Sequence, residues 1–309
     1  MSLTTIILAA GKSTRMLSLK SKLLFKISGE HIIEHVYRAA KSINSKNIIC
    51  VLGNSPQQLK DFIQKNKIKS VDQKNPCGTA DAVKTAISSM PVNKNNKILI
   101  LCGDVPFISP VTLKKMILKL DNSDLCLGTY MQENPTGYGR IIRNNKKIVG
   151  IIEEKDADSK IKKINEINTG IICVNEGVLR KFIGKIKNNN KQKEYYLTDI
   201  IKLLSDNDYK ISSYTIKNDL ETMGINSKKD LVGLERKLLI KKANDLLNKG
   251  VLIRDVMRTD IKGDLKVQKD VEIDINCIFE DKVTIGSNTT IGHNCYLNRC
   301  KIGKNVHIK

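Results

Sequence analysis

The sequence has no tryptophan, and aromatic residues make up only 4% of its 309 residues. It also lacks any apolar run close to the roughly 20 residues that a helix needs to cross a bilayer. Its first residues, MSLTTIILAAG, contain no basic segment and no cleavage-like site, so they do not resemble a secretory signal peptide. These absences predict a cytoplasmic protein without membrane insertion, whose first apolar run is a strand of the core.

Clustered cysteines and histidines are also missing. The eight cysteines are scattered without a C-x-x-C pair, and of the four histidines only His31 and His35 share a predicted helical face. Structural zinc sites need such ligands at short, regular spacings. The sequence therefore predicts no zinc site, and it favours reduced, mostly buried thiols.

Positive charge dominates, since 53 lysine and arginine residues against 32 acidic ones give a net charge of +21. A basic surface attracts polyanions without specificity. The lysines are spread over the whole chain, however, and in stretches such as KIKNNNKQK they accompany asparagine and isoleucine. This pattern favours a solvated lysine-rich surface over a patch for nucleic acid, so no specific nucleic-acid partner is predicted.

Short β-branched runs alternate with helical patterns up to about residue 227. The runs TTIILAA, NIICVLG, KILILCGD and DLCLGTY read as strands, and GEHIIEHVYRAAKSI and GTADAVKTAISSM carry apolar residues at helical spacing. Such alternation is typical of a doubly wound α/β sheet, which binds ligands beyond the carboxyl ends of its strands. We therefore predict a first domain over residues 1–227.

A helical arm is predicted over residues 228–250, because leucine and alanine recur there every three or four residues and Gly250 is placed to end the helix. The apolar stripe of this arm is formed by Leu231, Leu234, Leu238, Ala243 and Leu246. A stripe this short is more typical of simple packing than of a coiled coil.

The tail, residues 251–309, changes to a period of six. One apolar row contains Ile261, Val267, Ile273, Phe279, Ile285, Ile291 and Leu297. A second row keeps step with it: Leu265, Val271, Cys277, Val283, Thr289 and Cys295. The period resumes at Ile302 and Ile308 after a deletion of one residue. Neither an α-helix nor an ordinary sheet selects this period, so the tail is predicted to be a parallel β-helix of hexapeptide repeats.

The stretch LAAGKSTRM directly follows the first predicted strand. Gly11 allows a tight turn whose N–H groups face an anion, and Lys12, Arg15 and the later Lys22 add positive charge. The stretch matches neither a Walker loop nor a G-x-G-x-x-G motif. On its own it leaves a phosphate-binding loop and an ordinary strand–helix turn equally open.

Two further regions carry candidate ligand-binding residues. In LILCGDVPF, Asp104 comes just after a buried strand, where an aspartate either holds Mg²⁺ or caps a helix. In NPTGYGRI, Gly137 and Gly139 permit close approach of the backbone to a ligand. Glu153 and Asn168, in the stretches GIIEEKDA and EINTGI, are suited to binding sugar hydroxyls.

The motifs LAAGKSTRM, CGTADAV, CGDVPF, NPTGYGRI, EINTGI and EYYLTDII, together with Lys22, resemble in this order the bacterial N-acetylglucosamine-1-phosphate uridyltransferases. In that family this domain is fused to a glucosamine-1-phosphate acetyltransferase built on a left-handed β-helix. The resemblance covers essentially all 309 residues. It implies an α/β fold with a Rossmann-like nucleotidyltransferase domain, a helical arm and a short left-handed parallel β-helix with coils of about 18 residues.

The resemblance also implies a role for each matching residue. Nucleotide binding would involve Leu8, Ala9, Ala10, Gly11, Gln73, Gly78 and Thr79. The catalytic residues on the phosphates would be Arg15 and Lys22, and Mg²⁺ would be coordinated by Asp104 and Asn226. The N-acetylglucosamine moiety would be bound by Gly139, Glu153 and Asn168.

The implied activity is that of an Mg²⁺-dependent uridyltransferase that joins UTP and N-acetylglucosamine-1-phosphate to UDP-N-acetylglucosamine, with release of pyrophosphate. The product would serve peptidoglycan and lipopolysaccharide synthesis. Two alternatives stay open at this point: another sugar-1-phosphate nucleotidyltransferase, and a non-catalytic regulatory subunit with the same architecture. A homotrimer through the β-helix is a further expectation from the resemblance.

The sequence departs from the family at several points. Ser13 stands where relatives usually have a second glycine, Cys102 replaces an expected tyrosine, and SKLL replaces a proline–lysine pair while keeping Lys22. Only about three coils fit after residue 251, whereas the family's acetyltransferase site lies in later coils and a carboxyl-terminal segment. We therefore expect no acetyltransferase activity from these residues.

Overall fold

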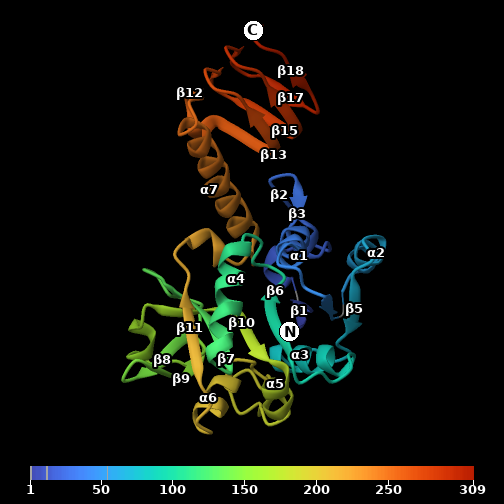
Figure 1. The fold of residues 1–309 in the computed structure, drawn as a ribbon, viewed down its shortest axis with the longest axis vertical. Helices are drawn as coiled ribbons and strands as arrows, with labels where there is room; N and C mark the ends of the chain where they lie inside the picture. Colours follow the sequence, from blue (N-terminus) through green and yellow to red (C-terminus); the bar gives the residue numbers. More distant parts are fainter. Residues whose placement is uncertain (1, 12, 54) are drawn as a thin grey trace. The chain divides into compact units, whose positions relative to one another are not determined.

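The structure is a computed structural model that describes residues 2–11, 13–53 and 55–309, so the predicted phosphate-loop residue Lys12 lies outside the described residues. The chain forms two compact units (Figure 1). The first contains the residues up to Leu23 together with Ile33–Gly224, and the second contains Leu24–Ile32 together with Ile225–Lys309. The domain boundaries expected from the sequence, at 227 and 250, stay predictions.

The first unit is built on a mixed sheet with the strand order β11-β7-β10-β6-β1-β4-β5, and β8 and β9 extend it beside β10. The strands are β1 (Ser2–Ala9), β4 (Asn47–Leu52), β5 (Lys69–Asp72), β6 (Asn96–Cys102), β7 (Leu125–Met131), β8 (Arg140–Asn144), β9 (Lys147–Ile152), β10 (Glu166–Asn175) and β11 (Ile211–Thr215). The four strands predicted from β-branched runs are confirmed as β1, β4, β6 and β7.

Strand direction decides where ligands can bind. β1 pairs in parallel with β4 and β6, so that Leu8 lies beside Cys102 and Ala9 lies beside Leu52. The carboxyl ends of these three strands therefore meet at one edge of the sheet, where α/β proteins bind ligands. β10 runs antiparallel to β6 and β7, with a register shift after Asn168.

Helices pack against the apolar side chains of the sheet. α3 packs against β1 and β4, α5 against β6 and β10, and α4 against β7 and β11. The helices of this unit are α1 (Ile32–Ser42), α2 (Gln57–Lys65), α3 (Thr79–Ser88), α4 (Pro110–Lys119), α5 (Glu176–Ile183) and α6 (Asp199–Ser205). The large core of isoleucine, leucine and valine side chains lies between this sheet and α3, α5 and α6.

The helix predicted over residues 29–43 begins later than its apolar pattern indicates. Ser28 and Gly29 have positive φ angles of 50° and 89°, and they form the turn of a hairpin between β2 (Lys26–Ile27) and β3 (Glu30–His31). Two successive residues in this conformation are incompatible with a helix and are typical of a tight hairpin turn. The helix α1 therefore starts only at Ile32.

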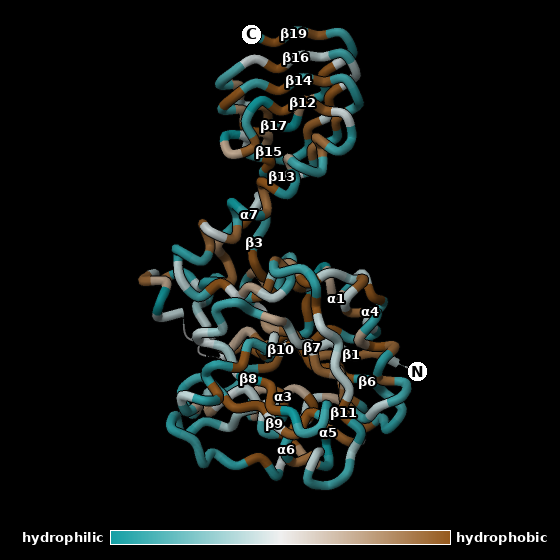
Figure 2. The backbone as a smooth tube through the Cα atoms, turned by 90° about the vertical axis from the view of Figure 1, so that its left-hand side faces the viewer, coloured by the Kyte–Doolittle hydropathy of each residue, from teal (hydrophilic) through white to brown (hydrophobic). Residues whose placement is uncertain are grey.

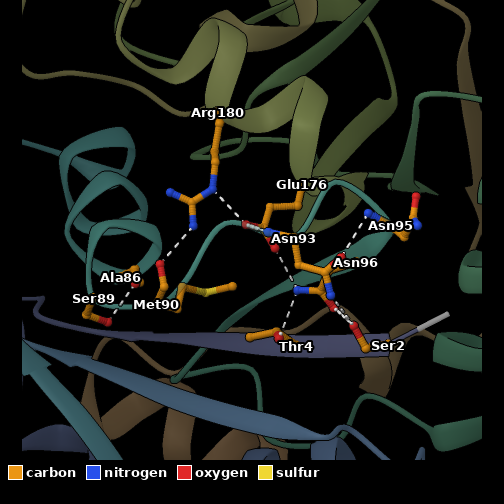
Figure 3. Close-up of polar contacts among 10 residues, drawn as sticks. All are labelled: Ser2, Thr4, Ala86, Ser89, Met90, Asn93, Asn95, Asn96, Glu176 and Arg180. Carbon is orange, nitrogen blue, oxygen red and sulfur yellow. Dashed lines mark hydrogen bonds and ion pairs between the residues drawn. The ribbon is translucent and has the colours of Figure 1, made fainter.

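A polar network lies at the amino-terminal ends of β1 and β6, where Ser2 pairs with Asn96. Figure 3 shows its hydrogen bonds and ion pairs. Glu176, at the start of α5, is fully buried and pairs with Arg180 at 2.7 Å. Its other carboxylate oxygen accepts a hydrogen bond from Asn96 at 2.8 Å, and Asn96 also donates to the hydroxyl of Thr4. The network thereby ties α5 to the first residues of β1 and β6.

The second unit begins its C-terminal part with α7 (Lys228–Leu247). Ser227 accepts a hydrogen bond from the backbone of Asp230, and the Asp230 carboxylate accepts one from the backbone of Ser227, which together form a capping box. The buried face of the helix contains Leu234, Leu239, Ala243 and Leu246. Two members of the predicted stripe, Leu231 and Leu238, are thus only half-buried. Leu239 takes the place of Leu238 as the leucine that faces the apolar core of this unit.

The hexapeptide tail forms a parallel β-helix, as predicted. Ile261 pairs with Phe279 and Ile273 with Ile291, which is the expected coil length, whereas Ile291 pairs with Ile308, one residue sooner. The missing residue in the last coil accounts for the shorter step. Figure 2 shows the coils stacked, and their strands are β12 (Leu252–Ile253), β13 (Thr259–Val267), β14 (Glu272–Ile273), β15 (Cys277–Ile285), β16 (Thr290–Ile291), β17 (Tyr296–Asn298), β18 (Lys301–Ile302) and β19 (His307–Ile308).

Both predicted rows point inward. Ile273, Phe279, Ile285 and Ile291 are almost fully buried, and Thr289 is the polar member of the buried rows. Asparagines at the corners have positive φ angles, for example 59° at Asn294, a conformation that asparagine tolerates better than most residues. No helix in the described part of the chain is long and apolar enough to span a bilayer.

Candidate active site

The residues predicted to bind the nucleotide and the metal in the first unit lie at the carboxyl end of β1 and in the loops after β1, β5 and β6. The backbone N–H of Gly103 donates to the carbonyl of Leu8, and the backbone N–H of Gln73 donates to the carbonyl of Leu52, so the loops after neighbouring strands touch. A cavity of about 280 Å³ opens beside the first loop. Its lining includes Ala9, Ala10, Gly11, Ser13, Ser55 and Pro76.

Lys22 and Asp104 form the charged pair of the site. Asp104 follows the end of β6, and its Oδ2 atom lies 2.5 Å from Nζ of Lys22, which begins a short 3₁₀ helix. The Lys22 side chain is 11% exposed and that of Asp104 is 23% exposed, so both reach solvent at the edge of the sheet. An ammonium group and a carboxylate in this position are suited to a phosphate and a divalent cation respectively.

The first loop does not require glycine at Ser13. This residue has φ −79° and ψ 34°, so its φ is negative and lies outside the left-handed region that favours glycine. A serine therefore fits where relatives of the family usually have glycine. Arg15 lies in the short 3₁₀ helix Thr14–Met16 and is exposed, and its predicted role on phosphate stays a prediction.

The predicted uracil-reading residues lie on one loop. Gln73 is buried, and its Nε2 atom donates to the carbonyl of Gly78 at 3.1 Å and to Asp81 at 2.6 Å. Gly78 has a φ of 128°, and a Cβ atom there would lie only 2.4 Å from the carbonyl oxygen of Tyr195. The position therefore requires glycine.

The motifs CGTADAV and EYYLTDII are held together by hydrogen bonds. The hydroxyl of Thr79 accepts one from the backbone N–H of Leu197 at 2.9 Å. The backbone N–H of Tyr195 donates to Cys77, and that of Ala80 donates to Tyr195. Two motifs that lie far apart in the sequence are thus joined in the structure.

The three predicted sugar-binding residues lie in contact. The backbone N–H of Asn168 donates to the carbonyl of Gly139 at 2.8 Å. A Cβ atom at Gly139 would lie 3.1 Å from Oε2 of Glu153, so the carboxylate fills the space that a side chain would occupy. Gly139, Glu153 and Asn168 therefore form one compact group.

Glu153 is half-buried, and desolvation raises the pKa of its carboxyl group. The nearby Asp199 and Asp156 raise this pKa further, while the hydrogen bond that the hydroxyl of Thr198 donates at 2.9 Å lowers it. The proton on this carboxyl group is therefore lost at a higher pH than from an ordinary glutamate. Any hydrogen bond that the ionised carboxylate accepts from a ligand will weaken as the pH falls.

Cys102 lies between the two halves of the site. Its thiol donates a weak hydrogen bond to the carbonyl of Gly170 at 3.8 Å, and the backbone N–H of Gly170 donates to the side chain of Asn168. Although Cys102 is partly accessible, desolvation of its sulfur raises its pKa to about 12, and the charge of Asp104 adds to the shift. The thiol is therefore protonated and unsuited to act as a nucleophile.

The sequence did not reveal the residues that fix the sugar-side loop. Arg140 is 1% exposed, donates to the carbonyl of Tyr138 and pairs with Glu154 at 2.7 Å. It therefore fixes the backbone beside Gly139 and the residue next to Glu153. One feature of the sequence could have indicated Arg140: an arginine stands directly before the apolar pair Ile141–Ile142. A charge at the start of a buried strand needs a partner.

The described residues are consistent with a phosphate-bound magnesium ion. They contain no cluster of three or more histidine, cysteine or acidic side chains placed for a metal. Mg²⁺ keeps several waters and is usually held by one or two carboxylates plus substrate phosphates, so the carboxylate of Asp104 fits that mode. Asn226 belongs to the second unit, and its predicted part in metal binding stays a prediction.

The comparisons with known proteins agree with this architecture. Residues 5–164 match the model of the MobA-like NTP transferase domain, and residues 264–299 match that of the bacterial transferase hexapeptide with six repeats. The chain is 38% identical over 309 residues to the bifunctional protein GlmU of Acinetobacter baylyi. This match covers 100% of the chain and 68% of that protein.

Solved structures share the fold of about three quarters of this chain at low identity. The UDP-glucose pyrophosphorylase complexed with UDP-glucose is 17% identical, with a TM-score of 0.65 over 78% of this chain and 100% of that one. A glucose-1-phosphate thymidylyltransferase assigned in Bacillus anthracis is also 17% identical, with a TM-score of 0.61 over 76% and 94% of the two chains. These likenesses confirm the nucleotidyltransferase fold.

Proposed function

Because the chain belongs to the GlmU family and is a nucleotidyltransferase, we propose that it transfers UMP from UTP to N-acetylglucosamine-1-phosphate. The products are UDP-N-acetylglucosamine and pyrophosphate. The observation that carries the proposal is that Lys22 and Asp104 lie on the same sheet edge as the group of Gly139, Glu153 and Asn168, with Cys102 between them. A triphosphate and a sugar phosphate bound to these two groups would lie side by side.

The reaction needs positioning and charge neutralisation rather than a covalent intermediate. A phosphate oxygen of the sugar phosphate attacks the α-phosphorus of UTP in line, and the bond from that phosphorus to the bridging oxygen of pyrophosphate breaks. Holding the reactants in line and neutralising the phosphate charge supply most of the rate enhancement in such transfers. The raised pKa of the Cys102 thiol is consistent with this scheme, because no nucleophilic side chain is required.

Each charged residue has a stated task in this scheme. Lys22 and Arg15 bind the phosphates of UTP and stabilise the negative charge that builds up during transfer. Asp104 would hold Mg²⁺, which would supply positive charge to neutralise the phosphates. Gln73, Gly78 and Thr79 contact the uracil. Glu153 accepts hydrogen bonds from the N-acetylated sugar, and Asn168 donates hydrogen bonds to it or accepts them from it.

Release of pyrophosphate from UTP tests the function directly. N-acetylglucosamine-1-phosphate, glucosamine-1-phosphate and glucose-1-phosphate are compared side by side, with Mg²⁺ and with chelator. We expect turnover with N-acetylglucosamine-1-phosphate to exceed that with either other sugar by on the order of 10²-fold, because contacts to the N-acetyl group would be lost. Equal or greater turnover with glucose-1-phosphate would instead indicate another nucleotide-sugar synthesis, and no turnover with any of them would indicate a non-catalytic subunit.

Addition of acetyl-CoA with glucosamine-1-phosphate in the same assay tests the expected absence of acetyl transfer.

The homotrimer and the cytoplasmic location expected from the sequence stay predictions.

The affinity for the sugar phosphate is expected to depend on pH through Glu153. Its raised pKa means that the carboxylate gains a proton as the pH falls through that value, and a charge-assisted hydrogen bond to the sugar is then lost. We expect KM for the sugar phosphate to rise about fivefold over this range while KM for UTP changes little. Steady-state kinetics across pH measure both constants.

The variant Glu153→Gln is the control for this pH dependence. It should show a high KM for the sugar phosphate that no longer responds to pH, since the amide does not titrate. A pH response that persists in Glu153→Gln would assign the effect to another group, such as the neighbouring Asp199, whose pKa burial also raises.

A further inference from the structure

Ser13 and Lys22 are joined across the first loop. The hydroxyl oxygen of Ser13 accepts a hydrogen bond from the backbone N–H of Lys22 at 3.1 Å. The carbonyl of Ser13 also accepts a hydrogen bond from the backbone N–H of Met16 at 3.0 Å. One residue thus fixes both the first turn of the loop and the residue at which the loop returns to the site.

The segment between these residues is anchored at its start by Met16, which is fully buried, and is exposed in its middle. Leu17 and Leu19 are 86% and 100% exposed, and Leu17 has a left-handed φ of 47°, which is unfavourable for leucine. Exposed leucines contribute no burial energy, so the part of the loop after Met16 depends more on hydrogen bonds at its end. The side-chain bond of Ser13 is one of those contacts.

The far end of the bond carries the site's ammonium group. Lys22 reaches Asp104 at 2.5 Å, and its side chain is 11% exposed. The hydrogen bond to its N–H fixes the backbone of Lys22, and this restricts the directions in which the Lys22 side chain can point. A displacement of about 1 Å at a catalytic group costs on the order of 10²-fold in rate, so this restriction matters for phosphate transfer.

We propose that Ser13 is a positioning residue, whose hydroxyl closes the Thr14–Ser21 loop and holds Lys22 in place for the transferred phosphate. This rests on the proposed function for its catalytic readout. The residue acts through Lys22 and does not itself touch the reacting atoms. A glycine at this position would lack the hydroxyl and would leave the Lys22 N–H to other partners.

The test is a double-mutant cycle. Ser13→Ala is expected to lower kcat about tenfold, with KM for the sugar phosphate unchanged, whereas Ser13→Thr keeps a hydroxyl and should retain most of the activity. In a Lys22→Ala background the same Ser13→Ala change should cost less than about twofold, because the group that it positions is gone. The matched control is Ser18→Ala, which removes a local hydroxyl bond to Lys20 within the same loop.

Tryptic cleavage after Arg15 or Lys20 provides a readout that needs no turnover. Ser13→Ala should be cut about fivefold faster than the wild type, while Ser18→Ala should be cut at the wild-type rate. Equal losses of kcat from Ser13→Ala in both backgrounds, or unchanged kcat and cleavage, would overturn the proposal. If the wild type releases no pyrophosphate from UTP, the proposed function fails, and the cleavage rates alone then decide whether Ser13 closes the loop.

Discussion

Asp104→Asn is expected to lower kcat by on the order of 10²-fold or more at saturating Mg²⁺, with UTP and N-acetylglucosamine-1-phosphate as substrates. The substitution keeps the shape of the side chain and removes its charge. It therefore removes both the carboxylate proposed to hold Mg²⁺ and the partner of Lys22 at 2.5 Å. Pyrophosphate release, measured as a function of Mg²⁺ concentration, gives the loss and any shift in metal affinity.

The chain offers a matched control at the opposite end of β6. Asp121 pairs with Lys97 at 2.5 Å, as Asp104 does with Lys22, but Lys97 lies at the start of β6 rather than beyond its end. Asp121→Asn should therefore change kcat by less than about twofold. Thermal unfolding of both variants separates a lost charge from a lost fold. Near-normal turnover by folded Asp104→Asn at saturating Mg²⁺ would remove Asp104 from the proposed site.

Glu176→Ala should lower the free energy of unfolding of the first unit by about 3 kcal/mol, since removing one partner of a buried ion pair strands the other. The two carboxylate oxygens of Glu176 accept hydrogen bonds from Arg180, Asn96 and the backbone of Asn93. All three donors lose their acceptor together. For a unit of this size the change corresponds to a fall of roughly 6 to 12 °C in Tm.

Chemical denaturation and calorimetry measure this loss, and two variants bracket it. Glu176→Gln keeps two polar atoms in place but loses the charge, so its loss should be smaller than that of Glu176→Ala. Glu133→Ala removes an exposed carboxylate and should stay within about 0.5 kcal/mol of the wild type. A loss below about 1 kcal/mol for Glu176→Ala would show that water replaces the carboxylate and that the network adds little stability.

Periodicity made the tail and the main strands predictable. A period of six fixes which residues point inward, so the burial of Ile273, Phe279 and Ile285 followed from the sequence. Even the shortened last coil was visible as a one-residue deletion before Ile302. The strands β1, β4 and β6 were equally clear, because apolar β-branched runs of this length are buried on both faces of a sheet.

The positions that were mispredicted depend on contacts from distant parts of the chain. Gly29 and Glu30 carry a helical pattern, yet they form a hairpin because Ser28 is held by Glu235 in the same unit. Leu239 replaces Leu238 on the buried face of α7 because the position of the β-helix core decides which leucine is covered. Local pattern does not contain this information.

In the candidate site, too, some residues could be predicted from the sequence and others depend on distant contacts. Its residue types were recognisable because phosphate, metal and sugar each select a distinct chemistry, and the neighbouring strand ends bring Lys22 and Asp104 together. The supporting residues were not recognisable. Arg140, Thr198 and the hydroxyl of Ser13 act through hydrogen bonds to residues elsewhere, and nothing in their immediate sequence indicates those partners.

The order in which the ribosome synthesises the chain determines when the hairpin β2–β3 can form its contacts. Ser28 is synthesised 207 residues before Glu235 and 233 residues before Ile261, both of which it contacts within the second unit. At typical elongation rates that delay is on the order of 10 to 40 s. A nascent chain that stops before residue 225 would therefore carry all strands of the first unit's sheet, while the stretch directly after Lys22 would still lack its anchor. The hairpin is thus anchored late, only after Glu235 and Ile261 of the same unit have emerged.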